Sequence, residues 1–245
     1  ASAGAPAPEL APAPAPEAED APTRRVFCED SLDWLRREGI PARAMVFTGI
    51  PDVCEVQERL HSLEAWRAWV DDVVKAILEA LPEGGAAVLV ETDTRAAGRG
   101  QLSKLALVLS AAEGVHGVKL LWHKVAHFGT ADEPSHGCPK FSHLLCFVRS
   151  EQGGRKLEDW AHGLPDVLWR GVKPRGLKNA ERCFGANMVR AVLQWASKCL
   201  DVDTVVDVFC GAGTALAVAN ALGLSAVGVD LSPKRARQAA ALDGR

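Results

Sequence analysis

The sequence of 245 residues has no run of about 18 apolar residues, the length that a helix needs to cross a bilayer, so we expect no membrane contact. It also lacks a strong charge of either sign, since the formal net charge of −3 excludes a generic binder of polyanions. The seven cysteines are an odd, scattered set rather than a disulfide framework, which is typical of a reducing, intracellular compartment. Cytoplasm, nucleus and organelle stay open. The chain does not begin with Met, as in a processed or trimmed product.

Composition divides the chain into an arm and one domain. Residues 1–24 are rich in Ala, Pro and Glu, so we expect a disordered arm without a catalytic role. Residues 25–245 are long enough for a single α/β domain, and an apolar content of 48% supports a real core. We divide this domain into a first half over 25–150, a connecting segment rich in basic residues over 151–182 and a last half over 183–245.

A glycine turn between two strands stands out near the end of the sequence. Val205 to Phe209 are typical of a buried parallel strand, and the chain then turns at Gly211-Ala-Gly213. A helix over 214–222 and a second strand over 226–229 follow, and Asp230 comes directly after that strand. The glycines allow backbone to approach a ligand closely, and the acid accepts hydrogen bonds from ribose hydroxyls. The order predicts a nucleotide-type site, although the third glycine of the dinucleotide fingerprint is missing.

The string Asp207-Val-Phe-Cys-Gly-Ala-Gly-Thr214 resembles the D-x-F-x-G-x-G-T motif of S-adenosylmethionine-dependent methyltransferases, especially those acting on amino groups of nucleic acids. The resemblance implies S-adenosylmethionine as the cofactor and a Rossmann-like α/β fold. In that fold a doubly wound, mostly parallel sheet has a terminal antiparallel strand. The motif comes last here, so the resemblance is to circularly permuted members. The implied cofactor-binding residues are Asp207, Phe209, Cys210, Gly211, Gly213, Thr214, Asp230 and, from the preceding segment, Asn187 or Lys178.

The sequence ends soon after a helix expected over 233–242. A third strand on the cofactor side of the sheet is therefore expected to be missing or truncated. In the same scheme, residues 25–150 are the half that holds substrate and residues 183–245 the half that holds cofactor.

Thr48-Gly-Ile-Pro-Asp52 follows a strand expected over 44–47 and takes the place of the catalytic T-S-P-P-Y motif of the similar enzymes. In that motif a polar side chain and a carbonyl beside proline accept hydrogen bonds from the amino group, and an aromatic residue stacks on the base. Gly49 replaces the polar residue and Asp52 the aromatic one, whereas Thr48 and Pro51 match. We predict Asp52, Pro51 and Thr48 as catalytic, with Asp52 as a base or a hydrogen-bond acceptor. The alternative is a turn in a protein that has lost catalysis.

Polar residues also follow the strands expected over 86–90 and 118–122. Since ligands bind at the carboxyl ends of strands in open α/β sheets, we predict substrate contacts from this edge. The candidates are Asp93, Arg95, His123 and Lys124. The structural alternative is a set of solvated strand ends and capping carboxylates.

Two further patterns carry weaker hypotheses. His136, Cys138, His143 and Cys146 suggest zinc ligands, but positions 143 and 146 of one strand point to opposite faces, so we predict no metal site. In residues 151–182, basic side chains alternate with Trp160 and Trp169. This favours phosphate contacts with base stacking, or alternatively two tryptophans packed on the sheet.

The resemblance implies a methyltransferase acting on nucleic acid. We favour RNA over DNA, because no domain for reading duplex sequence is evident and the aromatic position for a flipped base is altered. One alternative is a catalytically inactive, methyltransferase-like scaffold or RNA-binding subunit of a larger assembly. Another is a protein or small-molecule methyltransferase. A chain without a recognition domain would borrow one from a protein partner.

Overall fold

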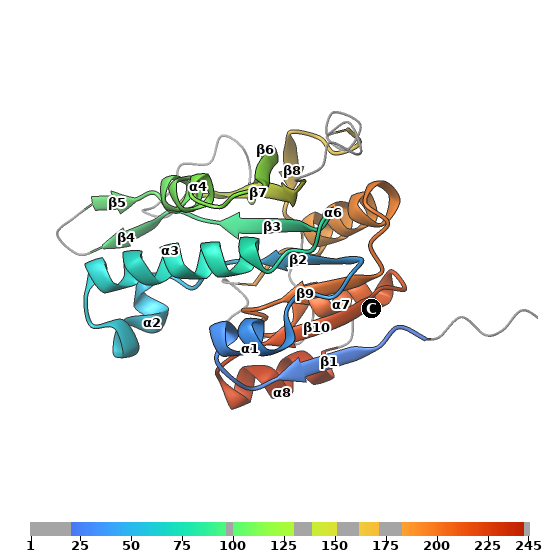
Figure 1. The fold of residues 1–245 in the computed structure, drawn as a ribbon, viewed down its shortest axis with the longest axis horizontal. Helices are drawn as coiled ribbons and strands as arrows, with labels where there is room; N and C mark the ends of the chain where they lie inside the picture. Colours follow the sequence, from blue (N-terminus) through green and yellow to red (C-terminus); the bar gives the residue numbers. More distant parts are fainter. Residues whose placement is uncertain (1–20, 97–99, 130–138, 151–161, 172–182, 243–245) are drawn as a thin grey trace, which may run out of the picture.

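The computed structural model describes residues 21–96, 100–129, 139–150, 162–171 and 183–242. These residues form an eight-stranded sheet with helices on both faces, beside a small two-stranded hairpin (Figure 1). The sheet strands, in spatial order, are β1 (Arg24–Phe27), β10 (Ser225–Val229), β9 (Thr204–Asp207), β2 (Ala44–Thr48), β3 (Ala86–Glu91), β7 (Phe141–Arg149), β6 (Val118–His127) and β8 (Val167–Trp169). The hairpin consists of β4 (Thr94–Ala96) and β5 (Gly100–Leu102).

Neighbouring strands of the large sheet are parallel except at β7, which runs antiparallel to both β3 and β6. The prediction of a mostly parallel α/β sheet is therefore confirmed. The antiparallel strand is not the terminal one, as we expected, because β6 and β8 pair beyond it. Sequence pattern alone does not reveal that a short strand inside the basic connecting segment extends the sheet.

β1 occupies the place beside β10 where we expected a strand to be missing. Its parallel register runs from the pair Arg24–Ala226 to the pair Phe27–Val229, and Asp230 N donates to the Phe27 carbonyl at 3.1 Å. That expectation was wrong, because the strand comes from the opposite end of the chain. Arg24, which we assigned to the disordered arm, already belongs to it.

Helices cover both faces of the sheet and bury two apolar layers. On one face lie α1 (Ser31–Glu38), α2 (Val53–Leu60), α3 (Leu63–Glu79) and α4 (Lys104–Glu113), and on the other α6 (Ala186–Cys199), α7 (Thr214–Ala221) and α8 (Pro233–Ala241). The apolar residues from Leu63 to Leu81 recur at helical spacing and predict a helix, which α3 confirms, since its inward side chains are buried. They are Trp66, Val70, Val73, Val74, Ile77 and Leu78. Full burial of such a side chain contributes roughly 1.5–3 kcal/mol.

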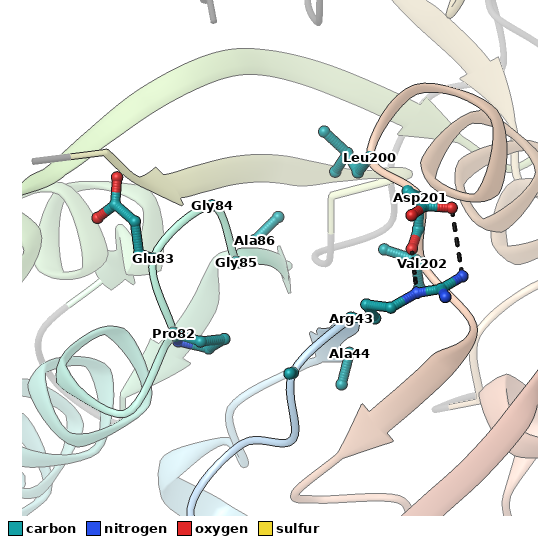
Figure 2. A pocket seen from close by; sticks show the side chains of 11 residues that line it. Arg43, Ala44, Pro82, Glu83, Gly84, Gly85, Ala86, Leu200, Asp201 and Val202 are labelled. Carbon is teal, nitrogen blue, oxygen red and sulfur yellow. Dashed lines mark hydrogen bonds and ion pairs between the residues drawn. The ribbon is translucent and has the colours of Figure 1, made fainter. Parts of the chain in front are cut away.

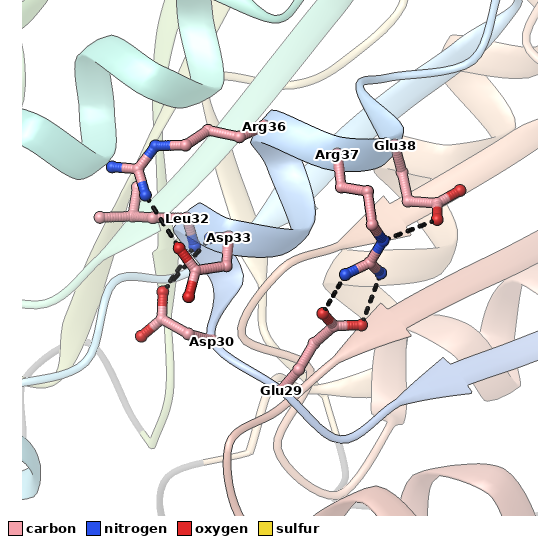
Figure 3. Close-up of polar contacts among 7 residues, drawn as sticks. All are labelled: Glu29, Asp30, Leu32, Asp33, Arg36, Arg37 and Glu38. Carbon is pink, nitrogen blue, oxygen red and sulfur yellow. Dashed lines mark hydrogen bonds and ion pairs between the residues drawn. The ribbon is translucent and has the colours of Figure 1, made fainter.

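The sequence predicts a short helix over 31–37 with Ser31 as its cap, and the observed cap of α1 differs by one residue. Asp30, rather than Ser31, caps the helix, because its Oδ1 accepts from Leu32 N at 2.9 Å and Asp33 N at 3.4 Å (Figure 3). The Ser31 hydroxyl instead donates to the Val208 carbonyl and ties α1 to the sheet.

Several short elements were not predicted, namely β1, α2, β4, β5 and β8. Each has no more than eight residues, too few for a periodic apolar pattern to distinguish it from a loop. His136, Cys138, Trp160 and Lys178 lie outside the described residues. Within the described part, the six cysteines are free thiols, and no helix is long and apolar enough to span a bilayer.

Candidate active site

The glycine turn between β9 and α7 lies at the carboxyl edge of the sheet. Gly211 and Gly213 have φ angles of +53° and +86°, which glycine adopts without strain. A Cβ at Gly213 would lie 2.6 Å from Ala239 Cα, so this glycine is required for α8 to pack. A Cβ at Gly211 would meet only the Phe209 carbonyl, at 4.0 Å. The Gly211 backbone is therefore the part of the turn that is open to a ligand.

Asp230 fixes this turn from the tip of β10. Its Oδ2 accepts from Gly211 N at 3.0 Å, and its Oδ1 accepts from Ser232 N at 2.8 Å. Burial raises the pKa of the carboxyl, although these two hydrogen bonds and Arg235 oppose the shift. Each carboxylate oxygen can accept a second hydrogen bond, so the arrangement is compatible with the predicted ribose contact.

Asp207 is fully buried and joins the cofactor motif to the T-G-I-P-D segment. Its Oδ1 accepts from Thr48 Oγ1 at 2.7 Å and from Phe209 N at 3.2 Å. Its Oδ2 is buried and has no hydrogen-bond partner among the described atoms. Burial raises the pKa of Asp207 from its ordinary value of 3.8 to about 7, against the opposing effect of the hydrogen bonds from Thr48 and Phe209. Thr48, predicted as catalytic, is buried and orients Asp207.

The other predicted cofactor residues lie around the same turn, with one exception. Phe209 packs edge-on against Trp69, with ring centroids 5.7 Å apart. Cys210 and Thr214 are buried, and burial raises the pKa of the Cys210 thiol. Asn187 lies in the first turn of α6 with its side chain against Gly171.

The position that carries a polar residue in the similar enzymes is filled by a neighbouring ring. A Cβ at Gly49 would lie 2.8 Å from the Val90 carbonyl oxygen and 3.2 Å from the Phe184 ring. Phe184 is itself held edge-on against Phe47, with ring centroids 5.3 Å apart. Packing therefore explains why Gly49 stands there.

A buried ion pair holds the Ile50–Asp52 segment. Ile50 N donates to Glu91 Oε1 at 2.9 Å, and Lys104 Nζ lies 2.6 Å from Glu91 Oε2. The same ammonium donates to the Ile50 carbonyl and lies 3.1 Å from Asp52 Oδ1. Burial raises the pKa of Glu91, with Lys104 opposing. Burial disfavours the charge on Lys104, but Glu91 and Asp52 outweigh it and raise the pKa of Lys104.

Sequence reasoning missed Lys104 altogether. A lysine in the first turn of a helix is normally interpreted as solvated, and nothing in its local sequence indicates that a strand supplies a buried partner. The sequence contained one indication of this buried pair: Glu91 is an acidic residue at the end of an otherwise apolar strand.

Asp52 combines a fixed position with access from outside. Its N donates to Glu55 Oε2 at 3.1 Å, while Glu55 N donates to its carbonyl at 2.8 Å, so the two residues start α2 as a capping pair. Its side chain is 31% exposed, and only Oδ1 is paired with Lys104. The Pro51 carbonyl accepts from Trp66 Nε1 at 3.2 Å.

Two of the predicted substrate residues lie at the β4–β5 hairpin. Asp93 Oδ1 accepts from Lys104 N at 2.9 Å, and its Oδ2 accepts from Gln101 Nε2 at 3.2 Å. Asp93 therefore organises the hairpin and the start of α4. Arg95 is exposed on β4.

His123 and Lys124 point to opposite faces of β6, so the structure does not bring them together. His123 is exposed, and its Nε2 lies 3.0 Å from His143 Nδ1. Lys124 is buried on the other face, with Nζ 3.0 Å from Asp166 Oδ1.

The zinc hypothesis gains nothing from the described residues. His143 and Cys146 lie on opposite faces of β7, as their spacing predicted, since Cys146 is buried in the core beneath α6 and α7. In the described ranges no group of three His, Cys, Asp or Glu side chains could hold a metal ion.

A hollow at the opposite end of the sheet carries no predicted site residue. It lies at the amino ends of β2 and β3, where Arg43 pairs with Asp201 at 3.2 Å and where Pro82 and Glu83 also line the wall (Figure 2). Ligands of open α/β sheets bind at the carboxyl edge, so we assign it no function.

Replacing Gly49 by Ser is expected to lower the free energy of unfolding by about 1–3 kcal/mol, because the new Cβ would press on backbone at Val90. Urea denaturation measures the change. Gly114→Ser is the control, since a Cβ there meets its nearest neighbours at 3.5 Å. Unchanged stability of the Gly49 variant would show that the segment has room for a polar side chain.

Comparisons with known proteins agree with this geometry. Residues 140–241, from β7 to α8, match the sequence model of the N6/N4 methyltransferase family, described as DNA methylase. The comparison with curated proteins finds no match.

Solved structures of methyltransferases share the fold. The PvuII DNA methyltransferase, specific for cytosine N4, superposes with a TM-score of 0.70 at 16% identity over 89% of this chain and 85% of that one. TTHA0409 of Thermus thermophilus, described provisionally as a DNA modification methylase and complexed with S-adenosylmethionine, gives 0.64 at 19% identity over 89% and 91%. The M1.HpyAVI complex with S-adenosylmethionine gives 0.58 at 10% identity over 89% and 97%.

At these identities the solved structures show the fold alone, and the family model matches residues 140–241, which are less than half of the chain. The chain therefore has the fold of S-adenosylmethionine-dependent methyltransferases, and residues 140–241, which include the D-x-F-x-G-x-G-T turn at the carboxyl edge, are similar in sequence to the DNA methylase family.

Proposed function

We propose that this chain is a methyltransferase that acts on an exocyclic amino group of a DNA base. The family match is to DNA methylases, and PvuII methyltransferase is specific for cytosine N4. The comparisons give no support to the preference for RNA. One structural observation carries the proposal: the Thr48–Asp207 hydrogen bond of 2.7 Å joins the cofactor turn to the T-G-I-P-D segment at one edge of the sheet.

The chain's own residues would bind and orient the reactants. The Gly211 backbone and the Asp230 carboxylate would line the site for the cofactor, which supplies an activated methyl group when bound, and the buried Asp207 would add its negative charge from behind the turn. Asp52 would accept a hydrogen bond from the target amino group and then the proton released as the carbon–nitrogen bond forms and the carbon–sulfur bond breaks. The buried Lys104 fixes the Asp52 carboxylate, so positioning is the main contribution of this segment.

Asp52→Asn is expected to lower kcat for methyl transfer to DNA about 100-fold, because the amide cannot accept the proton. Affinity for S-adenosylmethionine should be unchanged by calorimetric titration. The matched control is Asp201→Asn at the opposite end of the sheet, where the φ of +55° is one that Asn tolerates (Figure 2). Unchanged kcat in the Asp52 variant would remove its catalytic assignment.

A second candidate function is cofactor binding without catalysis, as a scaffold in a larger assembly. Two observations favour it: Phe184 fills the space beside Gly49, and Lys104 engages the Ile50 carbonyl. In the similar enzymes, the side chain at the position of Gly49 and the carbonyl at the position of Ile50 accept hydrogen bonds from the amino group of the base. Labelled-methyl transfer to separated DNA, RNA and protein fractions distinguishes the candidates. Saturable cofactor binding with no labelled fraction would support the scaffold.

We also propose that the chain is circularly permuted, as the motif order indicates. In support, the strand with the cofactor motif, β9, comes late in the chain yet lies between β10 and β2, while β1 from the beginning pairs beyond β10. The division into a substrate half and a cofactor half remains part of this proposal.

A further inference from the structure

One face of β7, β6 and β8 presents ring and apolar side chains to the surface. These strands lie at the edge of the sheet opposite β1 (Figure 1). Along each strand the side chains alternate, since Ser142, Trp122, Lys124, Ala126 and Leu168 are buried on the other face. The side chains between them form what we call the ring platform, which consists of Phe141, His143, His123, Val125, His127, Val167 and Trp169.

The register aligns three rings across three strands. His127 is the Cα partner of Phe141 on β7 and of Trp169 on β8. Neighbouring strands lie about 4.8 Å apart, so Phe141, His127 and Trp169 form one continuous row. The next row contains His143, Val125 and Val167.

Ring contacts continue along the strands. The Phe141 and His143 centroids are 5.2 Å apart, and so are those of His143 and His123. Burial lowers the pKa of both histidines, which favours the neutral form of these rings. His143 and His123 thus extend the ring surface that begins at Phe141.

The platform is open, and large exposed apolar groups in one patch mark interaction sites. Phe141 is 38% exposed, Trp169 54% and Val167 59%. Among the described helices, α6 contacts β8, whose Leu168 is buried in the core on the face opposite the platform.

The platform begins one strand away from the candidate catalytic segment. His143 is the Cα partner of Glu91, whose carboxylate accepts from Ile50 N at 2.9 Å. A strand of nucleic acid with its target amino group at Asp52 would have its neighbouring nucleotides over β7, β6 and β8.

We propose that the ring platform stacks unpaired bases of the nucleic-acid strand that flank the target. Aromatic side chains on a sheet face bind single strands in this way, with little dependence on sequence, because every base has a π-face. The proposal deepens the proposed function and rests on it for the position of the target. It also favours base stacking by Trp169 over the alternative that this tryptophan packs on the sheet.

Fluorescence anisotropy with a labelled single-stranded DNA of about 12 nucleotides tests the platform on the full chain. Trp169→Ala is expected to raise the Kd about tenfold, and Phe141→Ala to raise it to a similar extent. Trp169→Phe should retain most of the affinity. Leu120→Ala is the matched control, because Leu120 is 45% exposed on β6 outside the platform.

A second experiment uses an oligonucleotide that lacks the bases but keeps the phosphates. An abasic oligonucleotide of the same length should bind wild type and Trp169→Ala equally weakly. RNA of the same sequence should show the same loss in Trp169→Ala, since stacking is common to both nucleic acids. The proposal is overturned if Trp169→Ala binds the intact oligonucleotide like wild type, or if the abasic strand loses no affinity.

Two other results separate this proposal from the proposed function. Affinity for DNA that depends on Trp169, without methyl transfer to any DNA, would leave the platform standing and remove the enzyme assignment. Methyl transfer to DNA, with DNA binding unchanged in the Trp169 and Phe141 variants, would support the proposed function and overturn the ring platform as a binding site. A change of self-association in Trp169→Ala without a change in DNA binding would make the platform a protein interface and overturn the proposal.

Discussion

Lys104→Met is expected to lower the free energy of unfolding by about 3–5 kcal/mol at pH 8, because it leaves the buried Glu91 carboxylate without its counter-charge. Met has a similar length, so the loss reflects charge rather than a cavity. The substitution also removes the hydrogen bond to the Ile50 carbonyl and the ion pair with Asp52. Urea denaturation followed by circular dichroism measures the change.

The loss should shrink as the pH falls. Burial already raises the pKa of Glu91, and removing Lys104 raises it further. The folded variant then binds a proton that the unfolded chain has released, so its stability falls as the pH rises from the ordinary range of a glutamate through the raised folded value. The deficit relative to wild type is therefore smaller at pH 5 than at pH 8.

Two companion variants interpret the result. Lys75→Met removes an exposed pair with Asp71 on α3 and should have little effect. Lys104→Met combined with Glu91→Gln should recover most of the stability, because a neutral amide can still accept from Ile50 N. A double variant no more stable than Lys104→Met would show that packing, not charge, explains the loss.

Asp207→Asn is expected to stabilise the protein and weaken cofactor binding. At pH 8 the gain in the free energy of unfolding should be on the order of 2–4 kcal/mol, because the pKa near 7 means that the folded state holds an ionised carboxyl at a penalty. The amide keeps an oxygen for the Thr48 hydroxyl and Phe209 N, so the local contacts remain. Loss of the negative charge should lower affinity for the positively charged S-adenosylmethionine.

The sign of the pH dependence follows from the raised pKa. Between its ordinary value of 3.8 and about 7, the folded protein binds the proton of Asp207 more tightly than the unfolded chain does. Its contribution to stability is complete below about pH 4 and is lost as the pH rises through 7. The advantage of the Asn variant should therefore be small at pH 4 and largest at pH 8.

Urea denaturation at several pH values and calorimetric titration with S-adenosylmethionine check the two effects. Asp201→Asn controls for the substitution itself, since its side chain is 78% exposed. A stability gain that is the same at every pH would contradict the assigned ionisation. Unchanged cofactor affinity would remove Asp207 from the cofactor site.

Much of the fold followed from local pattern. The runs expected as strands over 44–47, 86–90 and 205–209 correspond to β2, β3 and β9, and the helix expected over 214–222 corresponds to α7. The glycine turn and Asp230 were also evident, because a strand, a turn requiring positive φ and a helix are neighbours along the chain. Because these contacts join residues that are close in sequence, they can be predicted from the order of residue types.

The candidate catalytic segment, Thr48 to Asp52, could be located from its place after a strand, but the contacts that fix its side chains could not be predicted. Gly49 is explained by Phe184, and Ile50 and Asp52 by Lys104, residues that are distant in sequence. The residue types of this segment do not indicate which distant residues contact it.

Period and spacing along the chain encode the alternation of strands and helices and the cofactor turn, so both could be predicted without a structure. Three features appear only in the folded chain: β1 completes the cofactor edge, Lys104 and Glu91 form a buried pair, and rings from three strands make one platform. The physical reason is that parallel and edge pairings join distant segments. Their register is set by packing between whole elements rather than by any local preference.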